Sequence, residues 1–263
     1  MIGIPSVVRQ TLALTGRELK HWYRSRMQIA MALIQPLMWL GLFGLAMSSF
    51  TQSMGVDYFS FLAMGMVIIT ALSTSMNSGM SVIWDRRFGF LNKLKAAPIP
   101  RGLIPLSKVL STTVKATVQS LLVLLVGLAL GLQLQVGFGI LDVLVIVAAV
   151  IMTALIFSSL FVTMGLVIDN QETIMGLNML LNLPLMFASG AMFPIAGLPG
   201  WLQTVAKFNP LTYAADAVRR AAMEWDPILM ASGSMGQDLL ILAIAALVMT
   251  VTGMALANRA LKA

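Results

Sequence analysis

Residues 141–168 read LDVLVIVAAVIMTALIFSSLFVTMGLVI, and Asp142 is the only charged residue among them. A helix needs about 20 consecutive, mostly apolar residues to cross the hydrocarbon core of a bilayer, which is about 30 Å thick. This stretch exceeds that requirement. It therefore predicts a transmembrane helix.

Five further stretches have the same apolar character. We predict membrane spans at about 28–49, 58–82, 106–131, 141–168, 173–195 and 237–257, with Asp169 to Glu172 as the polar break between the fourth and the fifth. The composition agrees, because 59% of the residues are hydrophobic and 10% are charged, whereas soluble domains carry about 25% charged residues. We expect an all-α polytopic membrane protein with six transmembrane helices in a single domain, residues 1–263.

The positive charges predict the orientation of these spans. Basic residues cluster before the first span, between the second and third spans and in the C-terminal tail, at Arg9, Arg17, Lys20, Arg24, Arg26, Arg86, Arg87, Lys93, Lys95, Arg101, Lys108, Arg259 and Lys262. The loops at 50–57 and 132–140 have none. Since loops rich in Lys and Arg stay in the cytoplasm, we expect a multi-pass protein of the cytoplasmic (inner) membrane with both termini cytoplasmic.

Because the basic residues cluster beside the spans, we expect the net charge of +7 to interact with anionic membrane lipid and not with nucleic acid. Lys115 lies about two turns inside the third span, and its long side chain is expected to reach back to the cytoplasmic side. Only Lys207, Arg219 and Arg220 fall on the outer side.

Residues 5–24 predict an amphipathic helix ahead of the first span. Val8, Leu12, Leu19 and Trp22 recur at helical spacing on one face, and the basic residues lie largely on the others. A span follows almost at once, so we expect this helix to lie in the membrane interface.

The cytoplasmic loop over 84–98 reads WDRRFGFLNKLKAAP. We expect a short helix over 84–97 on which Phe88, Leu91 and Leu94 share a face, and which Pro98 and Pro100 stop. A mixed apolar and charged helix suits docking into the groove of a partner protein. It equally suits a basic helix lying on anionic lipid, and the residues alone do not separate the two.

The outer region over 196–224 is too short and too interrupted to cross the bilayer. We expect a re-entrant or interfacial helix with Trp201 and Tyr213 at the level of the headgroups. Asn209-Pro210 predicts a turn or a helix start. Asp216 has the spacing to pair with Arg219 or Arg220 on one helix face, although a solvated surface pair would contribute little.

Three motifs resemble the permease subunit of type-two ATP-binding cassette (ABC) exporters, the ABC-2 type family. The loop matches an acidic-x-x-x-Gly-x-Leu-x-x-Leu-x-x-x-Pro pattern with Asp85, Gly89, Leu91, Leu94 and Pro98. The outer region is similar at 189–194, followed by Leu198-Pro199, and at 209–213, followed by Asp216 and Arg219. One departure is Asp85-Arg86-Arg87, where the family often has a Glu-rich run. The resemblance covers nearly the whole chain, which would then be one ABC-2 type transmembrane domain.

The resemblance implies a transport subunit that is not itself an enzyme. Two permease chains, expected to be a homodimer, would bind two separate ABC ATPase subunits and move a drug, a lipid or a glycan outward. The residues expected to couple to the ATPase are Asp85, Arg86, Arg87, Phe88, Gly89, Leu91, Leu94 and Pro98. Those expected at the outer gate are Gly190, Phe193, Pro194, Pro199, Trp201, Asn209, Pro210, Tyr213, Asp216 and Arg219.

Motifs for nucleotide, metal or acid–base chemistry are missing from the sequence. The phosphate loop Gly-x-x-x-x-Gly-Lys-Ser/Thr does not occur, so we expect no cofactor on this chain, and ATP and Mg²⁺ on the partner ATPase. There is no Cys and a single His, His21, so neither a catalytic nor a metal site is predicted. For Asp169 with Glu172, a loop cap explains the pair better than a membrane enzyme does.

The alternative function is an ATPase-independent channel or ion-coupled carrier. Such carriers place ionisable residues in mid-membrane, and the predicted spans hold almost none. Polar residues within the spans, at Gln35, Asn77, Gln119, Asn178 and Asn182, are expected to form hydrogen bonds between helices.

Overall fold

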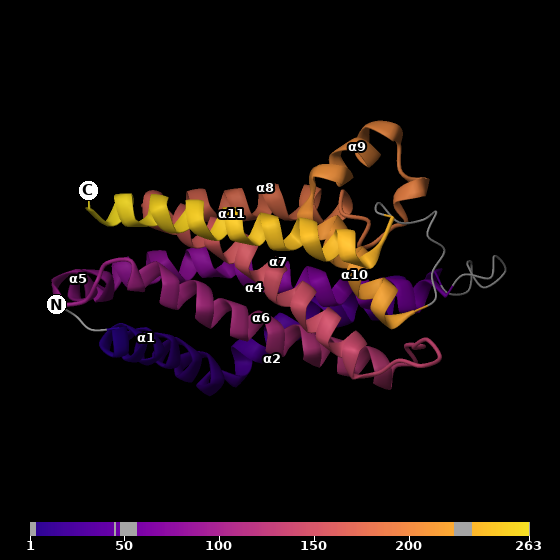
Figure 1. Cartoon of the computed structure of the whole chain (residues 1–263), viewed down its shortest axis with the longest axis horizontal. Helices are drawn as coiled ribbons and strands as arrows, with labels where there is room; N and C mark the ends of the chain where they lie inside the picture. Colours follow the sequence, from indigo (N-terminus) through magenta and orange to yellow (C-terminus); the bar gives the residue numbers. More distant parts are fainter. Residues whose placement is uncertain (1–3, 45, 48–56, 224–232, 263) are drawn as a thin grey trace.

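The computed structural model describes residues 4–44, 46–47, 57–223 and 233–262, and every regular element in these ranges is helical. The elements are α1 (Ile4–Arg24), α2 (Arg26–Trp39), the π-helix η1 (Leu40–Gly44), α4 (Tyr58–Arg87), α5 (Phe90–Ala96), α6 (Leu103–Ala129), α7 (Ile140–Val167), α8 (Gln171–Phe187), the 3₁₀-helix η3 (Ile195–Gly197), α9 (Gly200–Phe208), α10 (Pro210–Ala222) and α11 (Met235–Lys262). Figure 1 shows the long helices side by side in one elongated bundle, with α1 and α5 at one end and α9 and α10 towards the other.

Within the described residues, five helices are long and apolar enough to cross a membrane: Arg26–Gly44, Tyr58–Arg87, Leu103–Ala129, Ile140–Val167 and Met235–Leu261. Each overlaps a span predicted from the sequence, so the protein is a multi-pass membrane protein. The last residues predicted for the first span, most of the 50–57 loop and residue 224 of the outer region lie outside the described residues.

The fifth predicted span, 173–195, was placed too far along the chain at its C-terminal end. Helix α8 has 17 residues and ends at Phe187. Three residues later Gly190 has a φ of 68°, in the left-handed region where only glycine is at ease, and the chain turns there instead of continuing the helix. Residues 188–194 therefore belong to the outer region.

Helix α4 is the centre of the bundle. It contacts α6, α7, α8 and α10, and nearly all its residues from Tyr58 to Leu72 are buried. Two glycines bring its backbone against that of α7. A Cβ on Gly79 would lie 2.6 Å from the carbonyl oxygen of Phe161, and one on Gly165 would overlap the backbone of Gly79. Because only hydrogen fits between them, α4 and α7 pack with their backbones in direct contact.

Helix α11 packs on the other side of α7 in a similar way. A Cβ on Gly253 would lie 3.1 Å from the carbonyl oxygen of Ser159, and the Thr163 hydroxyl donates to the carbonyl oxygen of Gly253 over 3.0 Å. Helices α4, α7 and α11 therefore pack closely against one another, with α7 in the middle.

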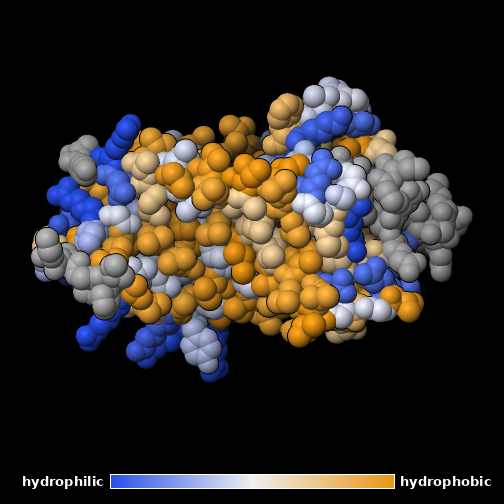
Figure 2. All heavy atoms as spheres, viewed as in Figure 1, coloured by the Kyte–Doolittle hydropathy of each residue, from blue (hydrophilic) through white to orange (hydrophobic). Residues whose placement is uncertain are grey.

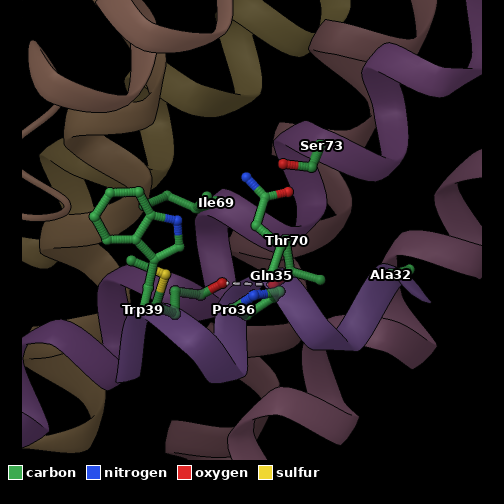
Figure 3. A pocket seen from close by; sticks show the side chains of 8 residues that line it. Ala32, Gln35, Pro36, Trp39, Ile69, Thr70 and Ser73 are labelled. Carbon is green, nitrogen blue, oxygen red and sulfur yellow. Dashed lines mark hydrogen bonds between the residues drawn. The ribbon is translucent and has the colours of Figure 1, made fainter. Parts of the chain in front are cut away.

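The first span is less regular. Pro36 lies inside α2, where it removes one backbone hydrogen bond, and the helix widens into the π-turn Leu40–Gly44 just after it. A small pocket opens here between α2 and α4. Figure 3 shows Gln35, Pro36 and Trp39 of α2 beside Ile69, Thr70 and Ser73 of α4 around it.

The outer surface of the bundle is apolar over its middle. Figure 2 shows this apolar band with hydrophilic residues gathered towards the two ends. Exposed apolar side chains from several helices contribute to the apolar surface, among them Leu125, Leu144, Leu180, Leu247 and Val251. In water such a surface would associate non-specifically, whereas acyl chains cover it at no cost.

Some polar side chains inside the spans bond between helices, as predicted. The hydroxyl of Thr74 in α4 donates to Gln119 in α6 over 2.5 Å, and Asn178 in α8 donates to the carbonyl oxygen of Met76 over 3.4 Å. Asn77 differs, because it is exposed and donates to Ser73 of its own helix.

Candidate functional site

The loop after the second span consists of a helix end, a glycine turn and a short helix. The single helix expected over 84–97 is divided, because α4 continues to Arg87 and α5 begins only at Phe90. Gly89 between them has a φ of 70°, a conformation that an L-residue with a side chain adopts only at a cost. The signal was present in the sequence as a glycine inside a helical pattern.

The expected shared face of Phe88, Leu91 and Leu94 does not form. Leu91 is 3% exposed and packs with Val82, Ile104 and Leu261, whereas Phe88 is 83% exposed. The turn at Gly89 rotates α5 relative to α4, which separates the two residues. Leu91, with Leu94 packed beside it, therefore anchors α5 to the bundle, and Phe88 points away from it.

The exposed residues of this loop form what we call the loop surface, which comprises Trp84, Arg87, Phe88, Asn92, Lys93 and Lys95. It combines two large exposed aromatic side chains with basic ones. Pro98 is also exposed, directly after the end of α5. Exposed aromatic and basic side chains together suit either a protein partner or the headgroups of anionic lipid.

Arg86 contacts the bundle and not the loop surface. Its guanidinium donates to the carbonyl oxygen of Leu166 over 2.5 Å and pairs with Asp169. It therefore satisfies a backbone acceptor at the C-terminal end of α7, where helix carbonyls lack intrahelical partners. Arg87 donates to the side chain of Gln171 at the start of α8 over 2.5 Å.

Five charged side chains from three helices meet at the base of the loop, and we call them the basal ion cluster: Arg17, Glu18, Asp85, Lys108 and Lys115. The Lys108 ammonium lies 2.5 Å from Asp85 Oδ2 and 3.2 Å from Glu18 Oε1. Arg17 lies 2.8 Å from Glu18 and 3.4 Å from Asp85, and Lys115 lies 3.9 Å from Glu18. Lys115 thus reaches towards the end of the bundle that holds α1 and the loop.

The cluster changes the acidity of Glu18. Burial acts to raise the pKa of this carboxyl group, but the positive charges of Lys108, Lys115 and Arg17 together outweigh burial and hold the pKa below its ordinary value. Among the cluster residues only Asp85 was singled out from the sequence as a site residue. No short motif marks the others, since their contacts join parts of the chain that are far apart.

In the outer region, Arg219 connects three segments. Its guanidinium donates to the carbonyl oxygens of Gly190 over 2.9 Å, Ala191 over 2.7 Å and Phe61 over 3.3 Å. The side chain is almost fully buried. Burial lowers the pKa of Arg219 to about 10, against which the charge of Asp216 acts, so the guanidinium remains charged at neutral pH.

The turn at 190–192 is fixed to α4 by further contacts. The hydroxyl of Tyr58 donates to the carbonyl oxygen of Met192 over 3.0 Å. A Cβ on Gly65 would overlap the carbonyl oxygen of Ala191. We call Tyr58, Phe61, Gly65 and Arg219, together with residues 190–192, the outer clamp.

Asp216 does not form a solvated surface pair with Arg219 or Arg220 on α10, which the sequence had left possible. Asp216 and Arg219 are both 2% exposed, and Arg220 lies 3.3 Å from Asp238 at the start of α11. Helix α10 packs against α4, α7 and α11, which removes these charges from water. The sequence did not signal this burial, because α10 carries its charges at the spacing of a surface helix.

Asn209 and Pro210 begin α10, as the sequence predicted. The side-chain carbonyl oxygen of Asn209 accepts a hydrogen bond from the backbone N–H of Leu211 over 3.1 Å, and Pro210 occupies the first turn of α10. The amide of the same side chain donates to the carbonyl oxygens of Leu185 over 2.8 Å and Ala188 over 3.3 Å. One residue thus caps α10 and holds the end of α8.

The remaining outer residues form the path between α8 and α10. Phe193 stacks on Phe187 with ring centres 6.1 Å apart. Pro194 and Pro199 precede η3 and α9 respectively. Trp201 on α9 is 69% exposed, and the Tyr213 hydroxyl donates to the carbonyl oxygen of Lys207 over 2.7 Å, which joins α10 to α9.

This chain is similar in sequence to known membrane transport proteins. The model of the ABC-2 type transporter family matches residues 9–223. The chain is 30% identical to the putative transport permease ycf38 of Cyanophora paradoxa, over 81% of this chain and 73% of that protein. It is 22% identical to the probable doxorubicin resistance ABC transporter permease protein DrrC of Mycobacterium tuberculosis, over 82% and 78%. It is 27% identical to the daunorubicin resistance ABC transporter permease protein DrrB1 of Streptomyces coeruleorubidus, over 79% and 73%.

The family match covers most of the chain, including most of α1, the loop surface, the basal ion cluster and the outer clamp. The relatives are permeases, in agreement with the apolar helices described above. The chain belongs to the ABC-2 type transporter family and is a multi-pass membrane protein with the role of a transport permease.

Proposed function

We propose that this chain is the membrane subunit of an ATP-driven exporter whose ATPase is a separate polypeptide. Two copies of the chain, with two ABC ATPase subunits, move an amphipathic or hydrophobic substrate outward across the cytoplasmic membrane. ATP and Mg²⁺ bind to the ATPase. Two relatives named for doxorubicin and daunorubicin resistance support a drug or another apolar molecule as the substrate class.

In this proposal α8 is the fifth of six spans, and α1 lies in the cytoplasmic interface. The 17 residues of α8 extend about 25 Å at 1.5 Å per residue, which is close to the thickness of the hydrocarbon core. On α1, Val8 is 52% and Leu12 65% exposed, so both are free to enter the lipid beside the basic residues of the helix. Figure 1 shows the start of α1 and the end of α11 at the same end of the bundle, which suits two cytoplasmic termini.

The observation that carries the proposal is the loop surface. Phe88 is 83% and Trp84 45% exposed at the end of the molecule where the basic residues gather. The end of α4 fixes their position relative to the bundle, because Trp84 lies in its last turn and the backbone N–H of Phe88 donates to the carbonyl oxygen of Trp84 over 2.9 Å. A rigid aromatic pair that protrudes from the membrane domain is suited to insert into a groove of the ATPase and to receive its motion.

The outer segments complete the proposed mechanism. Helix α9 is a short re-entrant or interfacial helix, and its exposed Trp201 suits the headgroup level. The outer clamp fixes the 190–192 turn to α4, so a shift of α4 at its cytoplasmic end is passed to the exit. The outer gate thus comprises Gly190, Phe193, Pro194, Pro199 and Trp201, with Asn209, Pro210, Tyr213, Asp216 and Arg219 holding it in place.

The test uses the affinity of the tagged chain for the ABC ATPase that copurifies with it. Phe88→Asp is expected to weaken ATPase binding by about thirtyfold, the effect of losing one hot-spot side chain. Phe208→Asp is the matched control, because Phe208 is 85% exposed on α9 at the other end of the molecule. Equal binding by both variants would reject the loop surface as the ATPase contact.

A transport measurement separates the proposal from a channel or ion-coupled carrier. Liposomes containing the chain and the ATPase are expected to move substrate only with ATP and Mg²⁺. Transport that follows an ion gradient in liposomes without any ATPase would contradict the proposed function.

A further inference from the structure

The basal ion cluster lies where α1, the loop and the third span, α6, meet. Its five charged residues come from α1, α4 and α6, and a small pocket beside it is lined by Leu14, Phe90 and Leu94 as well. Glu18, Asp85, Lys108 and Lys115 are each less than one-fifth exposed. Burying so many charges costs free energy unless each of them is paired, so their arrangement requires an explanation.

Lys108 is the centre of the cluster. Its side chain is 6% exposed, and its ammonium pairs with Asp85 and with Glu18. The ammonium also donates to the hydroxyl of Ser81 in α4 over 2.8 Å. A lysine ammonium has three donors, and these acceptors from α1 and α4 use them all. One side chain of α6 therefore joins three helices.

Arg17 makes a second connection, from α1 to the loop. Its guanidinium carbon lies 3.4 Å from the centre of the Phe90 ring in α5, within the range of a cation–π interaction. The same guanidinium lies 3.4 Å from Asp85 at the end of α4. Helix α1 is therefore held on both sides of the Gly89 turn.

Helix α1 also packs along α6 and touches α2. Among the side chains described on this helix, Thr11 and Thr15 are the buried ones, each 8% exposed, and they lie on the same face as Glu18. Two threonines bury little apolar area. The ion pairs of Glu18 and Arg17 are thus the strongest directional contacts between α1 and the rest of the protein.

From these contacts we propose that Glu18 and Lys108 are positioning residues that lock α1 to the loop, so that α1 and residues 84–96 move as one body when the ATPase acts. The locking itself is a property of this chain alone, and its role in transport rests on the proposed function. Helix α1 becomes a second arm of the coupling machinery, and the interfacial lipid around it bears directly on coupling.

The first experiment tests the locking without any ATPase. The chain has no native Cys, so spin labels at Ala13→Cys and Asn92→Cys, both exposed positions, report the distance from α1 to α5 in lipid vesicles. Lys108→Met is expected to lengthen and broaden this distance distribution. Lys108→Arg, which keeps the charge and the donors, is expected to retain the wild-type distribution.

Lys207→Met is the matched control, because it makes the same substitution at an exposed site on α9. Glu18→Gln replaces a single carboxylate oxygen with an amide nitrogen and serves if Lys108→Met fails to fold. An unchanged α1-to-α5 distance in both Lys108→Met and Glu18→Gln would overturn the proposal.

The second experiment tests coupling in liposomes containing the chain and its ATPase. Lys108→Met is expected to keep ATPase binding and hydrolysis but to lower the substrate exported per ATP by about tenfold, the scale of a typical coupling free energy. Lys108→Arg is expected to restore that ratio, which a general loss of stability would not predict.

The outcomes of the two experiments separate the two proposals. Wild-type protein that binds no ATPase contradicts the proposed function, while the distance measurement still decides the locking. A second outcome is that the wild-type protein exports with ATP, and that Lys108→Met lengthens the α1-to-α5 distance but leaves the substrate exported per ATP unchanged. This outcome would show that locking does not contribute to coupling, and it would overturn that part of the inference.

Discussion

The guanidinium carbon of Arg219 in α10 lies 3.5 Å from the centre of the Phe61 ring in α4. The ring covers one face of the buried cation, and the carbonyl oxygens of Gly190, Ala191 and Phe61 surround its edge. The buried charge is thus stabilised by backbone dipoles, by an aromatic face and by the negative charge of Asp216. The outer turn, α4 and α10 depend on the same side chain.

Replacing this cation tests the outer clamp. Arg219→Met leaves the three buried carbonyl oxygens without these donors, and the free energy of unfolding is expected to fall by about 3–5 kcal/mol. Thermal unfolding in detergent measures the loss. Arg9→Met, at an exposed position on α1, is the control and is expected to leave the unfolding temperature unchanged. A similar temperature for both variants would contradict this account of the clamp.

Gly65 tests whether α4 and the outer turn must be in direct contact. A methyl group at this position would overlap the carbonyl oxygen of Ala191, and overpacking of this kind costs about 1–3 kcal/mol. We expect Gly65→Ala to lower the yield of folded protein and its unfolding temperature. Gly176→Ala on α8 is the control, because nothing lies within 4 Å of the added carbon. Equal yields would show that the turn shifts without cost.

The two roles of Asn209 are separable by substitution. Asn209→Asp keeps the acceptor for the N–H of Leu211 but loses the donor to Leu185 and Ala188, whereas Asn209→Ala loses both. We expect Asn209→Ala to destabilise by about 1–3 kcal/mol, through the lost donor and the lost helix cap. Asn209→Asp is expected to destabilise more, because its buried carboxylate would face two carbonyl oxygens without a donor. Denaturant unfolding followed by the signal of the tryptophans distinguishes them. An Asn209→Asp variant as stable as the wild type would reject the second role of the side chain.

The ion pairs of Glu18 predict that the docking of α1 depends on pH. The folded-state pKa of Glu18 lies below its ordinary value of 4.5, so its pairs with Arg17, Lys108 and Lys115 stabilise the docked helix above that pH. The stabilisation is lost as the pH falls through the lowered folded-state value. Asp85 also pairs with Arg17 and Lys108, so it competes with Glu18 for the same positive charges.

The distance between spin labels on α1 and α5 measures this dependence. It is expected to stay constant from about pH 8 to about pH 5 and to lengthen at lower pH. In Glu18→Gln the low-pH transition is expected to shrink, because the neutral side chain no longer titrates. A transition of the same size in that variant would assign the pH dependence to another group.

The long apolar segments and the helix caps could be predicted from the sequence, because they depend on neighbours within one or two turns. Apolar runs located the spans, and Asn209-Pro210 marked the start of α10. The division of the 84–97 helix was missed because a single glycine weighs little in a helical pattern, although its φ of 70° decides the turn. Burial of Leu91 instead of Phe88 follows from that turn.

The outer clamp and the basal ion cluster depend on contacts between distant parts of the chain. Arg219 bonds to Phe61, which lies 158 positions earlier, and Lys108 pairs with Glu18, 90 positions earlier. Periodicity treats such residues as surface charges, and only the tertiary fold brings their partners to them. Lys115 is the exception, since its depth in an apolar span already required its side chain to reach towards the nearer end of that helix.

The glycine contacts of α4, α7 and α11 also restrict how this protein changes shape. The backbones of α4 and α7 touch at Gly79 and Gly165, and only two small side chains, Ser159 and Thr163, lie between α7 and α11 at Gly253, so these three helices have little room to shift relative to one another. Bending then falls to the two helices that contain an internal proline, α2 with Pro36 and its wide turn, and α8 with Pro184. An alternating-access cycle built on this chain would therefore have a stiff central wall, with hinges on either side of it.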